Sequence, residues 1–457
     1  MLKSKRTLIF FLALLLFYTR FVNLSWGLPY PLHPDERNMA NAIQDLNNLH
    51  FFAYGQFPLY LGYGGVQIFK FFDGDLGTPI GFQEAVISLR ILSALASVLT
   101  AIIVVRLVGL FFHPNFKHSP FFVLLSPFFI LIFSPALIQF SHFGTTESLL
   151  MFFYTAVVYV SLLYLKNRIS NKKFILASSL LVGLAIGTKI SSVIFLLLPL
   201  IILLWQAKTH RGGAYGLVGL LILTTAISVI VSPQNIISFD EFANSIRYES
   251  DVALGSRQVF YTRQFSDAIP IVFQFAKIFP YALGWPVFLA FLVGFFVLPY
   301  SRIYNFLRLA FLLYFLPNAF LYAKWTRFMA PVLPLMIVLA SLALVSVCHP
   351  RLVWTSDMLS GSAKCHSGLS RICRFWMRFF QSLTRMTISR FRNKFGMTLR
   401  KLVFYPLLFA SVVPGIAFLS IYTNPDVRLA ASEWIYKNIP KNSYILSETA
   451  NVVDLPL

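Results

Sequence analysis

Charged side chains are scarce in this chain of 457 residues, and their scarcity excludes an ordinary soluble domain. Only 12% of the residues are Asp, Glu, Lys or Arg, whereas a soluble domain carries about 25%. Hydrophobic residues make up 57% of the chain, and the mean hydropathy is +0.72. Apolar runs of about 20 residues, the length at which a helix spans a bilayer, recur along the whole chain. We therefore expect an all-α polytopic membrane protein, because a backbone in lipid must satisfy its own hydrogen bonds.

Cysteine is also scarce, which argues against a fold built on disulfides or zinc. The three cysteines, Cys348, Cys365 and Cys373, fall close together in a basic segment. Their spacing matches no zinc motif, and three cysteines do not form a disulfide framework. We interpret them as free thiols in a reducing compartment.

Acidic residues are few relative to basic ones, 17 against 38, so the formal net charge is +21. Such an excess of positive charge can indicate a nucleic-acid partner. Whether it does so here depends on where the charges fall relative to the apolar spans.

About eleven apolar spans are predicted. The first follows a short basic N-terminus, and no small-residue cleavage site comes after it, so we interpret it as an uncleaved membrane helix rather than a signal peptide. Only Gly187-Thr188-Lys189 interrupts the pair of spans in the middle of the chain. The predicted spans are 7–26, 86–112, 120–140, 149–165, 174–188, 190–205, 214–232, 280–299, 306–322, 328–348 and 402–422.

The charges orient these spans. With the N-terminus in the cytoplasm, the inner segments hold 23 of the 38 Lys and Arg residues, as the positive-inside rule expects. Sixteen of the 17 acidic residues then lie outside, and only Asp357 lies inside. The positive excess is thus a topology signal and an attraction to anionic membrane lipids, and we expect no nucleic-acid partner. This orientation predicts a multi-pass protein of the cell (inner) membrane.

Four regions follow from this topology. Residues 1–348 form the transmembrane region, 349–401 a basic inner segment, 402–422 the last membrane helix and 423–457 an outer tail. The first outer segment, 27–85, is rich in aromatic residues and glycine, which predicts helices that lie along the membrane interface. Segment 349–401 is either an amphipathic linker on anionic lipid or a site for regulation or a partner.

The motif "HPDER" at residues 33–37 follows the first span. Pro34 fixes the backbone before Asp35 and restrains His33. Asp35 and Glu36 are adjacent, so on a helix they would point about 100° apart. One reading makes both carboxylates first-turn charges of a helix that starts at Pro34 or Asp35. The other makes one of them a general base at the membrane face.

The motif "SHFGTTESLL" at residues 141–150 precedes the fourth span and lies on the same outer face. Glu147 starts a helix there, and either it belongs to a threonine–glutamate cap or it faces the same site as Asp35. His142 is nearby, and a lone histidine of this kind is commonly a hydrogen-bonded surface residue.

Three cations complete the constellation. Lys189 sits between two apolar runs, where a lone ammonium indicates a functional site unless its long side chain reaches the interface. Lys324 and Arg327 lie three residues apart at the outer end of two helices, and together they could clamp a lipid phosphate. An acidic base beside a basic clamp suits transfer from a lipid-phosphate donor to a hydroxyl.

In this order, the motifs resemble those of the GT-C glycosyltransferases. They look most like those of the bacterial members of the dolichyl-phosphate-mannose protein mannosyltransferase family and of the related lipid A aminoarabinose transferases. The resemblance covers roughly residues 7–345 and rests on "HPDE", "SHFGTTESLL", "GLAIGTKISS" and "RFMAPVLP". It implies a GT-C type bundle of about 11 transmembrane helices with interfacial helices in the first outer loop.

The resemblance also implies a function. The enzyme would take a sugar from a polyprenyl-phosphate donor on the outer face and transfer it with inversion. Asp35 would be the base with Glu36 as its neighbour and Glu147 nearby, Arg327 would lie near the lipid phosphate, and Lys189 would assist. The other candidates for substrate contacts are His33, His142 and Lys324.

The chain departs from the family pattern in three places. Glu147 stands where the family often has aspartate, and segment 349–401 is not expected. The tail reads to Leu457, and we expect the large C-terminal domain of related proteins to be absent or lost. The acceptor therefore stays open between a lipid-linked glycan, lipid A and a protein hydroxyl. No cofactor is certain, although a divalent ion between Asp35 and Glu147 is conceivable, since hard cations prefer carboxylates.

Two other classes of protein compete with this reading. A secondary transporter or lipid flippase would show charged residues at mid-membrane and a repeat of broken helices. Here the polar residues gather at one face, apart from Arg20, Arg90 and Arg106, and no internal repeat is visible. A membrane scaffold without catalysis is the third possibility.

Overall fold

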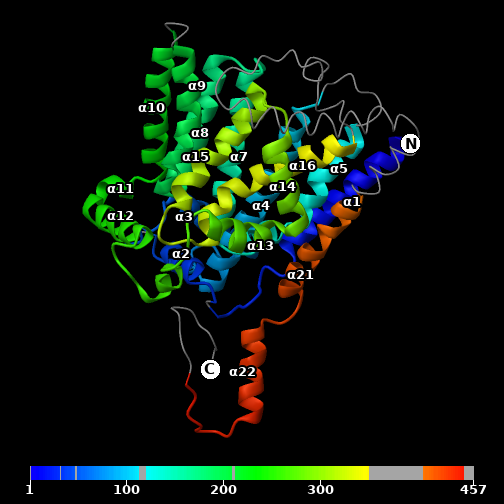
Figure 1. The fold of residues 1–457 in the computed structure, drawn as a ribbon. Helices are drawn as coiled ribbons and strands as arrows, with labels where there is room; N and C mark the ends of the chain where they lie inside the picture. The colour runs from blue at the N-terminus through cyan, green and yellow to red at the C-terminus, as the bar shows by residue number, and fades with distance from the viewer. Residues whose placement is uncertain are drawn as a thin grey trace.

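A computed structural model describes residues 2–30, 32–46, 49–112, 120–207, 212–348 and 405–446. These residues form helices joined by turns, with no strand among them (Figure 1). The predicted all-α class is therefore confirmed. The predicted inner segment 349–401, with Cys365 and Cys373, lies outside the described residues.

The centre of the bundle consists of three apolar helices. They are α4 (Phe82–Gly109), α7 (Glu147–Leu165) and α16 (Leu333–Cys348), which continues a short 3₁₀ helix, η5 (Thr326–Val332). These helices contact one another, and most residues of α16 are fully buried. Gly294 lets α14 (Trp285–Val297) approach α16 closely, because a Cβ there would lie 2.3 Å from the Leu339 carbonyl oxygen.

Four helical stretches among the described residues are long and apolar enough to cross a membrane, and a bent pair would add a fifth. The exact number of membrane spans therefore stays a prediction. Several predicted spans correspond to helices that are shorter or interrupted. The four stretches are Phe82–Gly109, Glu147–Leu165, Thr326–Ser346 and Tyr405–Thr423.

Breaks in the helices are stabilised by side chains that pair with the freed backbone. The predicted span 120–140 is two helices, α5 (Pro120–Ile132) and α6 (Pro135–Ser141). The buried Arg20 guanidinium donates to the carbonyl oxygens of Leu131 and Ile132 at the end of α5. Such carbonyls lack partners within their own helix, so Arg20 satisfies them. Arg20 belongs to α1 (Leu2–Phe21).

Two further breaks shape the bundle. The helix α8 (Asn171–Thr188) ends at Lys189, and a 3₁₀ helix, η2 (Ile190–Leu196), leads into α9 (Leu197–Ala207). The second break lies at Gly284, whose φ of +81° suits glycine. Around it, the stretch 274–283, which ends in α13 (Phe279–Leu283), bends by 117° from α14.

Two helices complete the side of the bundle that carries α8. The helix α10 (Gly212–Val231) packs on α8, where a Cβ on Gly183 would lie 2.7 Å from Ile227. The helix α15 (Arg302–Ala319) packs against η5 and α7.

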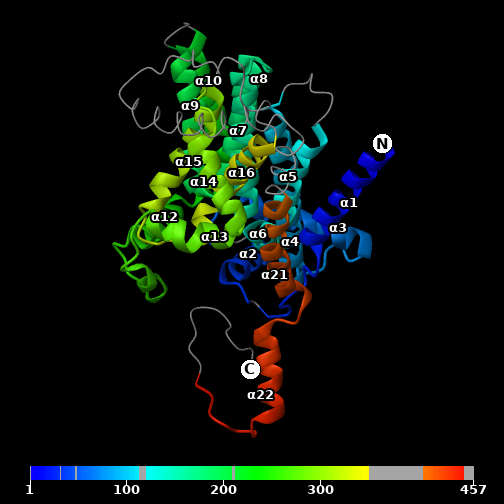
Figure 2. The same cartoon turned by 45° about the vertical axis from the view of Figure 1, so that its right-hand side comes forward.

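Short helices gather at one end of the bundle. In Figure 1, α2 (Pro34–Gln44), α11 (Gln234–Ile237) and α12 (Phe239–Leu254) lie at the lower end. α2 and α3 (Phe57–Asp73) are the helices predicted in the first outer loop. α21 (Val412–Thr423) runs to the same end, and α22 (Val427–Asn438) projects below it in both views (Figure 2).

Candidate active site

The site begins at the N-terminus of α2. His33 is the N-cap residue, with an extended backbone, and Pro34 occupies the first helical position. Proline suits that position because its fixed φ matches a helix and its missing N–H would be unpaired anyway. The Glu36 amide donates to the His33 Nδ1 atom at 3.4 Å. The predicted start of this helix is therefore confirmed, and Asp35 and Glu36 are both in its first turn.

Asp35 pairs with a cation that is far away in sequence. The guanidinium of Arg327, in η5, forms an ion pair and a hydrogen bond with the Asp35 carboxylate. The Arg327 guanidinium also lies over the Trp325 ring, 4.6 Å from its centroid, while its Nε atom is buried without a partner. Both side chains of the pair stay partly accessible, with 28% of Arg327 and 19% of Asp35 exposed. The pair is thus open to a ligand.

Positive neighbours keep Asp35 ionised. Burial acts to raise the pKa of Asp35, but Arg327, His33 and Lys189 lower it, as does a hydrogen bond from the Tyr54 phenol, so the net shift is downward. The buried Tyr54 phenol has a pKa well above its usual value, because burial disfavours the phenolate. Tyr54 therefore remains a hydrogen-bond donor to this carboxylate.

Lys189 reaches the same place through a break in the backbone. Its φ of −158° and ψ of 126° are extended, which ends α8 and turns the side chain out of the helix. The ammonium lies 4.9 Å from the Tyr54 ring centroid and 5.7 Å from that of Phe328. Among the described residues it has no ion-pair partner within 4 Å, so aromatic faces hold it.

A close contact positions Tyr54 over Lys189. The Gly55 amide donates to the Thr188 carbonyl oxygen at 2.9 Å. A Cβ on Gly55 would lie 2.0 Å from the Gly187 carbonyl oxygen, so only glycine fits there. The segment between α2 and α3 is thereby fixed to the end of α8.

Glu147 begins α7 and is 3% exposed. The capping interaction considered from the sequence is not formed, because Thr146 makes no side-chain cap and the hydroxyls of Thr145 and Thr146 have no partner. The carboxylate instead acts electrostatically on Lys189 and Arg327. The structure therefore brings Asp35, Glu147, Lys189 and Arg327 together.

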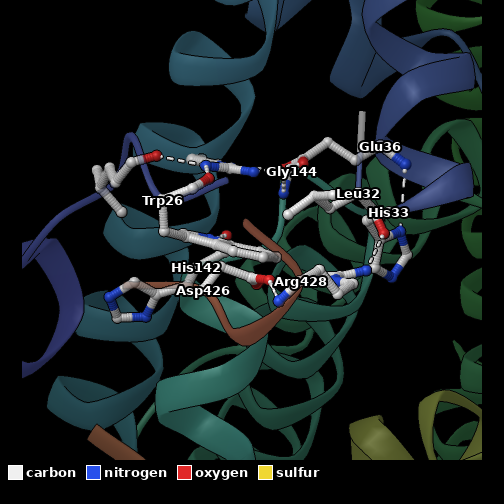
Figure 3. Close-up of polar contacts among 10 residues, drawn as sticks. Trp26, Leu32, His33, Glu36, His142, Gly144, Asp426 and Arg428 are labelled. Atoms are coloured by element: carbon white, nitrogen blue, oxygen red, sulfur yellow. Dashed lines mark hydrogen bonds and ion pairs between the residues drawn. The ribbon is translucent and has the colours of Figure 1, made fainter. Parts of the chain in front are cut away.

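Glu36 points away from this cluster into a buried ion pair. Its two oxygens accept from the Arg90 guanidinium at 2.7 and 2.6 Å, and one of them also accepts from the Gly144 amide at 2.6 Å. Arg90 donates further to the carbonyl oxygens of Leu24 and Trp26. Figure 3 shows Glu36 against Gly144. Glu36 thus holds three chain segments in place beside Asp35.

His142 is buried in a second contact network, away from Asp35. Its ring nitrogens lie 2.8 Å and 2.9 Å from the carbonyl oxygens of Ile138 and Val22, and its ring stacks on Tyr422 of α21 at 3.8 Å. Burial lowers the pKa of His142 to about 4, so the ring is neutral and donates to only one carbonyl at a time. The Trp26 indole donates to the His142 carbonyl oxygen.

The C-terminal tail also contacts the segment just before α2. The Arg428 guanidinium pairs with Asp426 and donates to the Leu32 carbonyl oxygen at 3.3 Å (Figure 3). Leu32 directly precedes His33, whose ring packs on Phe143 at 4.6 Å. The tail therefore contacts the segment that leads into α2, the helix that carries Asp35.

Lys324 is not brought into the cluster. Its ammonium donates to the carbonyl oxygens of Leu321 and Tyr322 in its own loop, and the residue is 4% exposed. Of the predicted pair, the structure places only Arg327 beside Asp35.

Sequence reasoning missed three contributors. Arg90 could have been found from the sequence, because an arginine within an apolar span requires a buried partner. No sequence signal pointed to Tyr54 or Glu249. Tyr54 is one aromatic residue among many, and Glu249 is a carboxylate in a long segment that is predicted to lie outside. Glu249, in α12, acts electrostatically on Lys189, Arg327 and Asp35.

A metal site is not evident within the described part of the chain, which holds no group of three or more His, Cys, Asp or Glu residues placed to bind an ion. The arrangement combines the partly accessible carboxylate of Asp35 with two cations. It can accept a proton and hold an anion side by side.

Comparison with protein families supports the resemblance drawn from the motifs. Residues 56–238 match the family model of dolichyl-phosphate-mannose-protein mannosyltransferases. This region contains Glu147 and Lys189 but neither Asp35 nor Arg327. No curated protein sequence matches the chain.

Solved structures share the fold. ArnT from Cupriavidus metallidurans in the apo state is 14% identical, with a TM-score of 0.54, over 99% of this chain and 84% of that one. The same protein bound to undecaprenyl phosphate is 17% identical, with a TM-score of 0.54, over 98% and 83%. The apo oligosaccharyltransferase of Archaeoglobus fulgidus is 14% identical, with a TM-score of 0.56, over 96% of this chain and 58% of that one.

These neighbours are GT-C enzymes, so the predicted GT-C type fold is confirmed. The resemblance to the mannosyltransferase family is confirmed over residues 56–238.

Proposed function

We propose, from the mannosyltransferase match and the geometry of the site, that the chain is a polyprenyl-phosphate-dependent glycosyltransferase of the cell (inner) membrane. It transfers a sugar from the lipid donor to a hydroxyl acceptor at the outer face, with inversion. The observation that carries the proposal is the contact between Asp35 and Arg327, which are separated by 292 residues and meet beside Lys189.

Arg327 and Lys189 hold the donor phosphate in this scheme. A guanidinium presents a planar pair of donors to a phosphate, whereas an ammonium acts as a point charge. The buried Nε atom of Arg327 has no partner and is available as a further donor. When a phosphate binds, it competes with Asp35 for Arg327 and frees the carboxylate.

Asp35 then acts as the general base. It takes the proton of the acceptor hydroxyl while that oxygen bonds to the anomeric carbon of the sugar. The bond from the anomeric carbon to the phosphate oxygen breaks, and its electron pair leaves with the polyprenyl phosphate. Arg327 and Lys189 stabilise the charge that develops there. Attack opposite the leaving group inverts the anomeric carbon.

Glu147 and Glu36 have different parts in this scheme. Glu147 faces the two cations from the start of α7 and balances their charge before the phosphate arrives. Glu36 positions Asp35 through its ion pair with Arg90. His33 stays beside Asp35 as a candidate substrate contact.

The solved neighbours support a lipid-phosphate donor. One is bound to undecaprenyl phosphate, and the oligosaccharyltransferase AglB from Archaeoglobus fulgidus is in complex with an inhibitory peptide and a dolichol-phosphate. For this chain, a lipid-linked glycan or a protein hydroxyl is the proposed acceptor. The sugar is not specified by the site.

The test is the variant Asp35→Asn, with Asp45→Asn as the matched control. Asp45 is the exposed C-cap residue of the same helix and has no ion-pair partner among the described residues. Purified protein in lipid is incubated with polyprenyl-phosphate sugars extracted from cells, and release of polyprenyl phosphate is measured. We expect Asp35→Asn to lose at least about 100-fold in rate, the usual contribution of a general base, and Asp45→Asn to keep its rate.

Two results would overturn the proposal. If the Asp35→Asn variant releases polyprenyl phosphate at the unaltered rate, Asp35 is not the general base. Movement of an intact lipid-linked sugar across the bilayer by the unaltered protein, without release of polyprenyl phosphate, favours a transporter or flippase instead.

A further inference from the structure

A cavity lies at the end of the bundle opposite Asp35. It has a volume of about 240 Å³ and is lined by residues of α7, α9, α15 and the loop that follows α7, among them Asn167, Trp205 and Arg302. The helix α7 separates it from Glu147 by 19 residues, or about 28 Å at 1.5 Å per residue. The cavity is therefore independent of the site described above. It is smaller than the roughly 300–1,000 Å³ of a pocket for a drug-sized ligand, so it fits a compact group.

The walls of this cavity are fixed by contacts that do not depend on a ligand. The Tyr164 phenol donates to the Gln206 Oε1 atom at 2.5 Å and joins α7 to α9. On the opposite side, the Arg308 guanidinium donates to the carbonyl oxygens of Phe295 and Leu298 and fixes the turn before α15. Arg302 projects from that turn. The cavity is thus preformed.

Arg302 supplies the charge. Its guanidinium lies 4.0 Å from the Trp205 ring centroid, which holds it by a cation–π interaction. Among the described residues it has neither an ion-pair partner nor a hydrogen-bond acceptor, and the Asn167 side chain has no partner either. The described loops at this end, 110–112, 166–173 and 298–302, contain no Asp or Glu. An anion is the ligand that these groups lack.

An apolar surface continues from the cavity along α9. Ile201, Leu204 and Trp205 are exposed by 37%, 51% and 55%. A free phosphate makes no contact with this apolar surface, whereas the acyl chain of a lipid packs against it. Tryptophan beside a cation is also the composition typical of the membrane interface.

We propose that this cavity binds the phosphate-bearing headgroup of an anionic phospholipid, with Arg302 as its phosphate ligand. The planar guanidinium, held over Trp205, presents two parallel N–H groups to the phosphate. Asn167 adds an amide donor. The acyl chains lie along α9.

The test uses the full-length protein purified in detergent and native mass spectrometry with added phosphatidylglycerol. Arg302→Ala is compared with Arg168→Ala, an exposed arginine of the neighbouring loop that does not line the cavity. We expect Arg302→Ala to weaken phosphatidylglycerol binding about tenfold, as the loss of a hydrogen bond to a charged group does, while Arg168→Ala binds like the unaltered protein. Circular dichroism and melting temperature check that both variants are folded.

Three results would overturn the proposal. Equal weakening by the two arginine variants would mean that only the general positive charge matters. Equal binding of phosphatidylcholine and phosphatidylglycerol would mean that the anionic headgroup is not recognised. Displacement of the lipid by millimolar inorganic phosphate would assign the cavity to the free anion.

Discussion

At the scale of single residues, the ion pair between Arg327 and Asp35 keeps the proposed base in its charged form. Burial alone would raise the pKa of Asp35, and the neighbouring cations more than reverse that effect. The folded-state pKa is therefore below the ordinary value, so the carboxylate stays ionised and its contribution to stability is lost only as the pH falls through that lowered value. A base held in an ion pair is charged but not free, which makes the displacement of Arg327 part of the proposed reaction.

The variant Arg327→Gln tests this coupling. Removal of the guanidinium removes the largest influence that lowers the pKa of Asp35, so we expect the acid limb of the pH–rate profile to move to higher pH. The rate at neutral pH should fall by at least about tenfold because a phosphate ligand is also lost. The measurement is kcat/KM as a function of pH for both proteins, because kcat/KM reports the free enzyme, in which Arg327 pairs with Asp35. A fall in rate with an unmoved acid limb would show that Arg327 does not act on the base.

At the scale of elements, Glu36 and Gly144 bring α2, α4 and the loop before α7 into contact. Glu36 and Arg90 are 3% and 1% exposed, so the pair is buried, and the Gly144 amide completes the hydrogen bonding of the carboxylate. Removal of one partner of a buried pair costs about 3–5 kcal/mol, because the other charge is left uncompensated. This arrangement explains why an acidic residue next to the proposed base has a different role.

The variant Gly144→Ala tests the close approach. A Cβ there would lie 2.7 Å from the Leu89 Cβ and 2.9 Å from the Glu36 Oε1 atom. We expect the melting temperature to fall and the transfer rate to fall with it, since Asp35 is displaced. Gly64→Ala is the control, because a Cβ at this helical position meets nothing within 4 Å. It should stabilise the protein slightly, by about 0.5–1 kcal/mol. Equal melting temperatures for the two variants would contradict the packing argument.

At the scale of the whole molecule, the two ends of the bundle differ in charge. The carboxylates among the described residues lie at or beyond the end that carries α2, and the loops at the end that carries Arg302 have none. We propose that the α2 end faces outward. The tail contact between Arg428 and Leu32 is at that same end.

Cysteine labelling tests this orientation. The three native cysteines are replaced by serine, and Asp45→Cys or Arg168→Cys is introduced singly. We expect a membrane-impermeant maleimide to label Asp45→Cys in intact cells and Arg168→Cys only after the membrane is opened. The reverse labelling pattern would show that the α2 end, with the proposed active site, faces the cytoplasm.

Much of this fold could be predicted from the sequence, because long apolar runs permit only helices in lipid. The start of α2 could be predicted as well, since Pro34 and the two carboxylates are local signals. The pairing of Asp35 with Arg327 could be expected only through the family resemblance, because no local rule joins residues so far apart. The burial of His142 depends on tertiary packing against Tyr422 of α21, which residue spacing does not reveal. Lys324 instead bonds to carbonyl oxygens of its own loop, a local backbone turn that the sequence did not indicate.

Lys189 has a consequence for the speed of donor capture. Its ammonium rests on the rings of Tyr54 and Phe328 and forms no ion pair with a described residue. A phosphate can therefore reach Lys189 without displacing a carboxylate, whereas Arg327 must first leave Asp35. Arrival of the lipid should accordingly be fast and sensitive to ionic strength, with the slower exchange at Arg327 deciding which bound donors stay long enough to react.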